Sequence, residues 1–185
     1  MMKGLVLIVV VLLTASMPSY AGGWYNQIGL SYASGISEVS DIYEKNLESG
    51  PFVDKVDVTL VPIGGSYAGY YQYESGLRTG LGLGPLFLIL GDASHTEAPI
   101  NANVGWTFSP ETKISPFFSV GISKHIVSGD YVEGDSVGLF FEAGFTYKKY
   151  GVKLILDKSE VELESVNGLK TVNSYDTVVT LFTQF

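Results

Sequence analysis

The 185-residue sequence contains no cysteine, and this absence excludes several classes of protein. A disulfide scaffold and a thiolate metal site both depend on cysteine side chains. A lipoprotein anchor needs a cysteine as well, and it is excluded for the same reason. We therefore expect neither a disulfide framework nor a thiolate metal site. The acidic loops, such as Asp130–Asp135, offer oxygen ligands for a divalent cation but lack the spacing of a calcium loop, so solvated loops without a metal are favoured. Nothing in the sequence calls for a cofactor.

Charged residues are also scarce, and basic residues are the scarcer kind. Only 16% of the chain is charged, and 11 Lys and Arg stand against 19 Asp and Glu, for a net charge of −8. A typical soluble domain carries about a quarter charged residues. Nucleic-acid binding requires a basic face. The balance therefore argues against nucleic acid as a partner, and the low charge content points away from an ordinary water-exposed surface.

Long apolar runs are missing everywhere except at the N-terminus. There, Lys3 precedes an apolar segment, Leu5–Leu13, and small residues surround Ser19–Ala21. This layout is typical of a secretory signal peptide, and the segment is too short for a membrane-spanning helix of about 20 residues. We predict a signal peptide at residues 1–21 and a single mature domain at residues 22–185. An exported chain without later apolar helices is either a periplasmic β-protein or a membrane barrel.

What the sequence does contain is a side-chain period of two, which is typical of β-strands. It predicts eight strands, and the last one alternates to its final residue, Phe185. The expected strands are Trp24–Ser34, Val56–Tyr73, Leu77–Leu90, Pro99–Phe108, Ser115–Val127, Val137–Tyr147, Gly151–Glu160 and Asn173–Phe185. An irregularity near Pro62–Gly65 is interpreted as a β-bulge.

The connections between these strands alternate in length. Those after the second, fourth and sixth strands are short and rich in turn-forming residues. The others are longer and acidic, and we expect solvated surface loops there, including a solvated His95; they are Gly35–Lys55, Gly91–Ala98, Ser128–Ser136 and Val161–Val172. Short turns at one rim and long loops at the other are typical of outer-membrane barrels. An even number of strands lets the first and last strands pair and close the sheet.

The two faces of each strand differ in a way that predicts which face meets lipid. In Val137–Tyr147, the odd positions are mostly large and apolar, while Gly138, Glu142, Gly144 and Thr146 stand on the other face. A soluble barrel would carry many Lys, Glu and Arg residues on its second face. Small polar residues suit instead the crowded interior of an eight-stranded barrel. We therefore expect the apolar face to meet lipid, and the glycines of Gly80–Gly84 to line the lumen.

Aromatic residues gather beside the short turns and the chain ends. Such a girdle is typical of a membrane interface. Its predicted members are Trp24, Tyr71, Tyr73, Trp106, Phe108, Phe145, Tyr147 and Phe185.

With these features together, the whole mature chain resembles the small eight-stranded outer-membrane β-barrel proteins of bacteria. The resemblance is carried by Ser19–Ala21, by the alternating strands, by Gly80–Gly84 and by the terminal Val179–Phe185. It implies an all-β, closed, antiparallel, up-and-down transmembrane barrel in the outer membrane. It also implies contact with outer-membrane lipid and lipopolysaccharide, assembly by the barrel-assembly machinery through the C-terminal strand, and a monomer. No motif selects a subfamily, and a soluble β-sandwich is the alternative.

One group of side chains could carry catalysis. If the hairpin turns symmetrically through Asp130–Asp135, Ser123 lies nearly opposite Glu142, with His125 one step nearer the loop. A hydroxyl, an imidazole and a carboxylate are the parts of a nucleophile, base and orienting group. Some outer-membrane barrel enzymes that deacylate lipid A use Ser, His and Glu. Here, however, the local motif lacks their Asn and the predicted face is the lumen, so a hydrogen-bonded network is favoured.

The remaining inward charges are Arg78, Lys153 and Asp157, and together with Glu142 they can form opposite-charge pairs inside the barrel. Three inward aromatic residues, Phe117, Phe140 and Phe182, add bulk. An eight-stranded barrel has an interior just wide enough for side chains to fill. The sequence therefore predicts a filled lumen and disfavours an open pore.

Three functions remain compatible with these observations. The first is a non-catalytic outer-membrane barrel whose surface loops contact the envelope, ligands or other cells. The second is a lipid A-modifying hydrolase using Ser123, His125 and Glu142, and the third is a narrow channel. We favour the first, because the signals for the other two are thin.

Overall fold

The computed structural model describes residues 22–34, 36–49, 58–108, 112–174 and 177–185. The predicted signal peptide, residues 1–21, lies outside these described residues. Within them, no helix is both long enough and apolar enough to cross a membrane.

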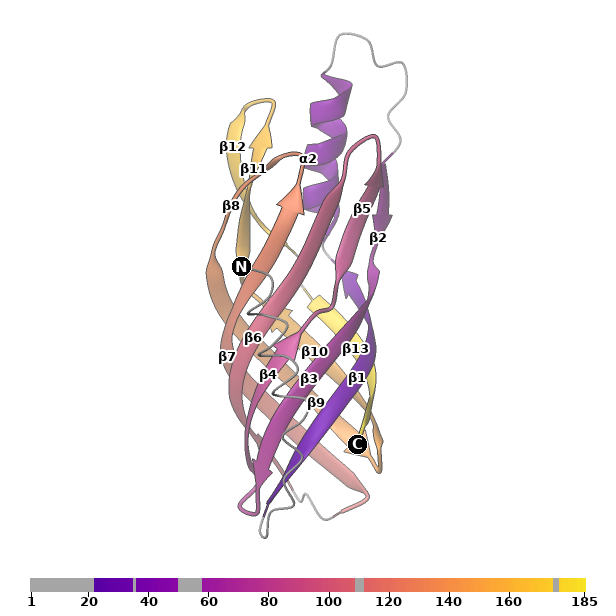
Figure 1. The fold of residues 1–185 in the computed structure, drawn as a ribbon, viewed down its shortest axis with the longest axis vertical. Helices are drawn as coiled ribbons and strands as arrows, with labels where there is room; N and C mark the ends of the chain where they lie inside the picture. The colour runs from indigo at the N-terminus through magenta and orange to yellow at the C-terminus, as the bar shows by residue number, and fades with distance from the viewer. Residues whose placement is uncertain (1–21, 35, 50–57, 109–111, 175–176) are drawn as a thin grey trace, which may run out of the picture.

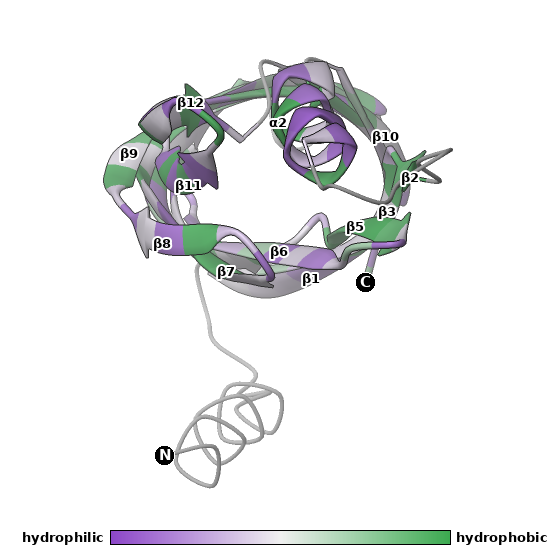
Figure 2. Ribbon diagram, turned by 90° about the horizontal axis from the view of Figure 1, so that it is seen from above, coloured by the Kyte–Doolittle hydropathy of each residue, from purple (hydrophilic) through white to green (hydrophobic). Residues whose placement is uncertain are grey.

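Eight antiparallel strands form a closed barrel, as the sequence predicted (Figures 1 and 2). Around the barrel they follow the order β1, β3, β4, β6, β7, β9, β10 and β13, and β13 returns to β1. The first and last strands pair through registers such as Tyr32 with Val179. The bounds are β1 Gly22–Ser34, β3 Ile63–Tyr73, β4 Leu77–Leu83, β6 His95–Thr107, β7 Ile114–Gly129, β9 Val137–Tyr147, β10 Tyr150–Asp157 and β13 Thr177–Gln184.

Five shorter strands extend the barrel at its long-loop end. They are β2 Val58–Val61, β5 Phe87–Gly91, β8 Val132–Asp135, β11 Glu160–Ser165 and β12 Gly168–Asn173. The predicted strands Val56–Tyr73 and Leu77–Leu90 are therefore each broken in two. The first break is at Pro62, which has no N–H for the ladder, and the second begins at Gly84, whose φ of +86° departs from extended backbone. β2 pairs with β5, and β11 pairs with β8 and β12.

A helix stands where a loop was predicted at Gly35–Lys55, and this is a correction. The helix α2 spans Ser37–Glu48, and its buried residues include Val39, Ile42 and Tyr43. These positions are three and four apart, so they share one helical face. Glu38 in the first turn and Lys45 in the last turn also complement the helix dipole. The helix signal was present in the sequence, among charges that suggested a solvated loop.

The helix closes the long-loop end of the barrel. It packs against β2, β11 and β12, and in the view from above it lies within the ring of strands (Figure 2). Its apolar face joins a core to which the extension contributes Val161 and Leu163. On the other side, Asn46 holds the β11–β12 turn by donating to the Glu164 carbonyl at 2.6 Å and accepting from the Val166 N–H at 2.9 Å. We call this assembly of α2 with the extension strands the cap.

Two further predicted loops are largely strand. The segment Gly91–Ala98 contains the start of β6 at His95, and Val161–Val172 is the β11–β12 hairpin. The alternation of buried and exposed residues continues from the barrel through the start of β6 and through β11, whereas the first four residues of β12 are all exposed. In Val161–Val172 the acidic residues Glu162 and Glu164 occupy the outer face of β11, whereas Glu97 in the other segment points inward and is buried.

The outer and inner faces change polarity between β10 and β11, which follow each other along the chain. Within β10 the outward side chains Leu154 and Leu156 are exposed and the inward side chains Lys153 and Asp157 are buried. Within β11 the outward residues are glutamates, as at Glu162, and the inward residues are apolar. The same positions face outward along both strands, but the outward residues change from apolar to charged near Lys158. The outer face therefore suits an apolar medium on one side of Lys158 and water on the other.

The predicted girdle residues lie on the outer face near the short-turn end. Seven are exposed, namely Trp24, Tyr73, Trp106, Phe108, Phe145, Tyr147 and Phe185. Tyr71 is partly buried, with its ring edge-on to those of Trp24 and Tyr73 at centroid distances of 5.6 and 4.7 Å. Together with the exposed leucines and valines of the strands, they form an apolar belt around the barrel.

Candidate functional site

Buried charges inside the barrel form two groups, and the first is a three-residue ion cluster. Glu142 on β9 contacts Arg78 Nη2 at 2.9 Å through Oε1 and Lys153 Nζ at 3.0 Å through Oε2. All three side chains are at most 7% exposed. Buried charges persist in proteins when they are paired and hydrogen-bonded. We call Arg78, Glu142 and Lys153 the lumen cluster.

Neighbouring side chains complete the environment of this cluster. The Arg78 guanidinium lies over the rings of Tyr70 and Phe117, at 4.1 and 4.4 Å from their centroids. Lys153 also donates to Gln27 Oε1 at 3.4 Å. Such cation–π contacts add stability where the cation is desolvated. Because the cluster has two cations and one carboxylate, the aromatic rings at Arg78 and the Gln27 amide at Lys153 help to stabilise the excess positive charge.

These side chains leave little open space in the lumen. Two cavities beside the cluster have volumes of ≈ 10 and ≈ 40 Å³. By this measure of volume, a cavity needs about 10–15 Å³ to hold one water molecule, so the two have room for a few waters at most. Glycines on the inner face permit this density, since a Cβ added at Gly82 would meet Asn101 Nδ2 at 2.6 Å and one at Gly151 would meet the Phe182 ring at 2.3 Å. The lumen around the cluster is therefore filled by side chains.

The second group links the helix to the barrel wall. The His125 imidazole contacts Glu97 through Nδ1 and lies 3.2 Å from Asp157 Oδ2 through Nε2. Glu97 also meets His95 Nε2 at 3.2 Å, and His95 Nδ1 meets the Tyr43 hydroxyl of α2 at 3.0 Å. We call these five residues the cap network. It contains both histidines of the chain.

Burial fixes the state of the tyrosine at the helix end of this network. Desolvation raises the pKa of Tyr43 to about 12, against a hydrogen bond with the Tyr131 backbone that lowers it. Its ring packs edge-on against His95 and Tyr131, with centroid distances of 5.4 and 5.0 Å. The hydroxyl therefore stays neutral and hydrogen-bonded at ordinary pH.

This raised pKa predicts a measurable titration. The pKa of Tyr43 lies above the ordinary value of about 10, so the stability it contributes is complete below pH 10 and is lost as the pH rises toward 12. We expect the tyrosinate absorbance that Tyr43→Phe removes from the titration to have its midpoint near pH 12. A midpoint near 10 in this difference titration would mean that α2 does not dock on the barrel.

The structure separates Glu142 from the other two catalytic candidates, Ser123 and His125. Ser123 pairs in register with Gly138, and the residue opposite Glu142 is Ser119. The predicted register was wrong because the chain reverses at Asp130–Tyr131, while the following strand β8 pairs with β11. Glu142 is held by Arg78 and Lys153, whereas the carboxylates beside His125 belong to Glu97 and Asp157.

The other inward residues divide between the two groups. Arg78, Glu142 and Lys153 meet in the lumen cluster, and Asp157 lies in the cap network, where it accepts from the Ser159 N–H at 2.9 Å and hydroxyl at 2.7 Å. Phe117, Phe140 and Phe182 are all buried. Among the described residues, no group of three His, Asp or Glu side chains is arranged to hold a metal ion.

Sequence reasoning missed the parts of the cap network that it had assigned to loops. His95, expected in solvent, is 3% exposed, and Glu97 is equally buried. A signal for both existed, because His95, Glu97 and Pro99 continue the parity of the inward residues of β6. For Tyr43 the signal was its spacing of four residues from Val39, which places both on one face of a helix.

Comparisons with known proteins bear on the fold. No protein-family model matches the sequence, and no curated protein matches it. Among solved structures, the outer membrane protein OprG from Pseudomonas aeruginosa is similar, with a TM-score of 0.55 and 10% sequence identity over 89% of this chain and 96% of OprG. At this identity the likeness concerns the backbone alone. The chain therefore has the fold of an eight-stranded outer-membrane β-barrel, with no subfamily identified.

Proposed function

We propose that this chain is a non-catalytic integral protein of the bacterial outer membrane, with a closed lumen and a capped outer end that serves as an interaction surface. The observation that carries the proposal is the exchange of faces along β10 and β11. Leu154 and Leu156 stand on the same outer side as Glu162 and Glu164. Apolar side chains on the outer face of β10 and charged ones on the outer face of β11 are both favourable only if hydrocarbon surrounds β10 and water surrounds β11.

The same reasoning orients the barrel. On β7 the outward apolar row is first interrupted at Lys124, with one exposed isoleucine, Ile126, beyond it. On the path from β10 to β11 the row ends at Lys158, and both lysines lie toward the cap. The short turns and the aromatic girdle lie at the opposite end, which in outer-membrane barrels is periplasmic. The cap then projects outside the cell. Its outer face is acidic, with exposed residues such as Glu44, Asp92 and Glu162.

A conducting function has little support from the interior. The lumen cluster, three buried phenylalanines and the helix α2 fill successive levels of the barrel, and the cavities beside the cluster are small. A hydrolase has little support as well. Ser123, His125 and Glu142 are buried inside the barrel, and Glu142 is held by Arg78 and Lys153 in the separate lumen cluster.

Several partners follow from this placement as parts of the proposal. A signal peptide at residues 1–21 directs export, and the barrel-assembly machinery recognises β13 with Phe185. Outer-membrane lipid surrounds the belt, and lipopolysaccharide meets the lysines at its outer boundary. The barrel acts as a monomer, because its own strands pair around the complete circle.

Fractionation and electrical recording test the proposal together. We expect the full chain, expressed in a Gram-negative host, to accumulate in the outer membrane and to show no steady conductance after purification into planar bilayers. The control is Arg78→Ala/Glu142→Ala, which empties part of the lumen and should raise transient conductance. Recovery in the soluble periplasmic fraction would refute the membrane placement, and discrete steady conductance of the wild type would refute the closed lumen.

A further inference from the structure

A furrow runs over strand β3 on the outside of the barrel. It consists of two hollows of ≈ 300 and ≈ 440 Å³ that share Tyr67 as a lining residue. The first lies toward the short-turn end, beside Trp24 and Leu81, and the second lies toward the cap, beside Ile28 and Leu83. No charged residue lines either hollow. We call the two together the β3 furrow.

Two outward glycines, Gly65 and Gly69, open the floor of the furrow. Neither has a positive φ, so the backbone does not require glycine there. A Cβ added at Gly65 meets nothing within 4 Å, and one at Gly69 meets Asn26 Oδ1 at 3.5 Å and the Tyr67 hydroxyl at 3.8 Å, which is ordinary contact. Inward glycines differ, since a Cβ at Gly80 would lie 2.7 Å from Tyr70 Cβ. The outward glycines leave space that no other part of the barrel fills.

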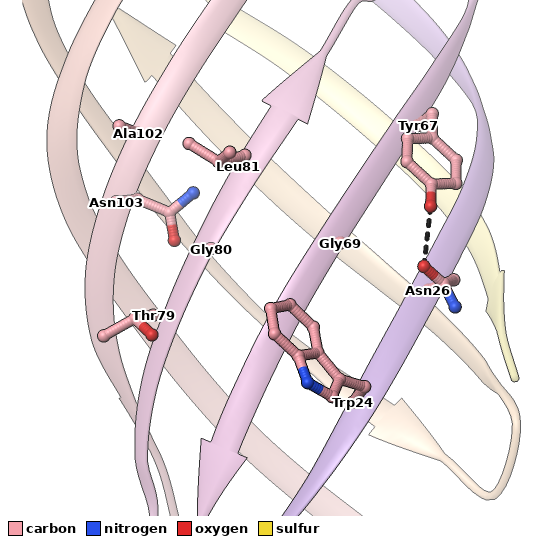
Figure 3. A pocket seen from close by; sticks show the side chains of 9 residues that line it. All are labelled: Trp24, Asn26, Tyr67, Gly69, Thr79, Gly80, Leu81, Ala102 and Asn103. Atoms are coloured by element: carbon pink, nitrogen blue, oxygen red, sulfur yellow. Dashed lines mark hydrogen bonds between the residues drawn. The ribbon is translucent and has the colours of Figure 1, made fainter. Parts of the chain in front are cut away.

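Polar groups occupy the end of the furrow near the girdle (Figure 3). The Tyr67 hydroxyl donates to Asn26 Oδ1 at 2.6 Å, and Thr79 stands across the hollow on β4. Among the described residues, none accepts a hydrogen bond from Asn26 Nδ2, and none bonds the Thr79 hydroxyl. Polar groups facing hydrocarbon are costly unless they are hydrogen-bonded. Two neutral donors within an otherwise apolar belt thus call for an acceptor from the membrane itself.

We propose that the β3 furrow binds one glycerophospholipid from the periplasmic leaflet, with an ester carbonyl on Asn26 and Thr79 and an acyl chain along Gly69 and Gly65. The inference rests on the membrane placement proposed above. Asn26 lies two residues from Trp24 on β1, and interfacial tryptophans mark the level of the lipid headgroups. Ester carbonyls are uncharged acceptors at that depth. The absence of charged lining residues means that the acyl and ester region, and not the headgroup, is recognised.

The position of the furrow along the barrel favours a phospholipid over lipid A as the occupant. Its polar end lies near the short turns, whereas lipid A occupies the leaflet at the cap. A second copy of the chain would have to cover the same polar groups with a side chain. Lipid A binding and dimer formation are therefore outcomes that the experiment must separate from phospholipid binding.

Native mass spectrometry of the full chain in detergent, with added diacyl phosphatidylethanolamine or lipid A, tests the proposal. We expect the wild type to retain one phosphatidylethanolamine. Gly65→Leu/Gly69→Leu, which fills the furrow, and Asn26→Leu, which removes the donor, should each lower retention about tenfold or more, as expected for 1.4 kcal/mol or more of lost binding free energy. The matched control is Ala143→Leu, which places a leucine on the exposed outer face of β9, away from the furrow, and should leave retention unchanged.

The outcomes separate this inference from the proposed function. Equal phosphatidylethanolamine retention by all variants, preferential retention of lipid A, or a dimer mass lost in Gly65→Leu/Gly69→Leu would each overturn the lipid site. Insertion of every variant into phospholipid vesicles is measured in parallel, with strand content by circular dichroism. If the wild type fails to insert, the membrane placement itself is wrong. If it inserts and retention does not depend on the furrow, only the lipid site is wrong.

Discussion

Replacing Glu142 with glutamine is expected to lower the free energy of unfolding of the whole barrel by about 3–5 kcal/mol, because it breaks a buried ion cluster from its centre. Glu142 is the carboxylate between Arg78 and Lys153, and both cations remain buried after the change. Glutamine keeps the shape and the hydrogen-bonding capacity of the side chain but not its charge. The lost unfolding free energy therefore arises from two uncompensated cations and not from a cavity.

Urea titrations in detergent micelles, followed by tryptophan fluorescence, measure this loss. A second variant makes the test specific. In the Glu142→Gln background, Lys153→Met removes one of the stranded cations and should recover part of the lost stability. The control is Glu162→Gln, which neutralises an exposed carboxylate on β11 and should change stability by less than about 0.5 kcal/mol. If the Glu142 and Glu162 variants unfold at the same urea concentration, the cluster does not support the barrel.

The cap should respond differently to damage, because its apolar core lies above the lumen cluster and reaches the barrel interior through a few residues such as Phe140 and Ile155. Tyr43→Ala removes a fully buried ring that packs on His95 and Tyr131, and we expect a loss of about 3–5 kcal/mol in the docking of α2. Because the barrel strands pair independently of α2, this loss should be local. The expected signature is rapid protease cleavage within Ser37–Glu48, while the urea midpoint of the barrel changes little.

Tyr43→Phe separates packing from hydrogen bonding at the same position. It keeps the ring but removes the hydrogen bond to His95. The docking free energy of α2 should therefore fall by a smaller amount, about 1–3 kcal/mol, with a correspondingly smaller loss of protease resistance. Hydrogen exchange of the α2 amides provides the same measurement on intact protein. Global unfolding of Tyr43→Ala, without prior opening of α2, would mean that cap and barrel form one cooperative unit.

The lumen cluster shows why part of the site was predictable and part was not. Glu142, Lys153 and Arg78 lie on regular strands, where parity alone assigns them to the lumen. Their meeting at one level depends on the registers of β4, β9 and β10, which parity does not supply. The register between β7 and β9 was missed by four residues, since the turn at Asp130–Tyr131 was taken to be wider. That shift put Ser119, and not Ser123, opposite Glu142.

By itself, the sequence determined the closed eight-stranded barrel, the outward direction of its apolar residues and the position of its aromatic girdle. Each of these depends on the two-residue period and on turn composition, which are local properties. The tertiary structure alone decided that α2 closes the long-loop end, that His95 and Glu97 join His125 inside the barrel, and that Gly65 and Gly69 open a furrow on the outer face. These features depend on contacts between residues far apart in the chain, and side-chain alternation fixes which face a residue takes but not which residues meet there.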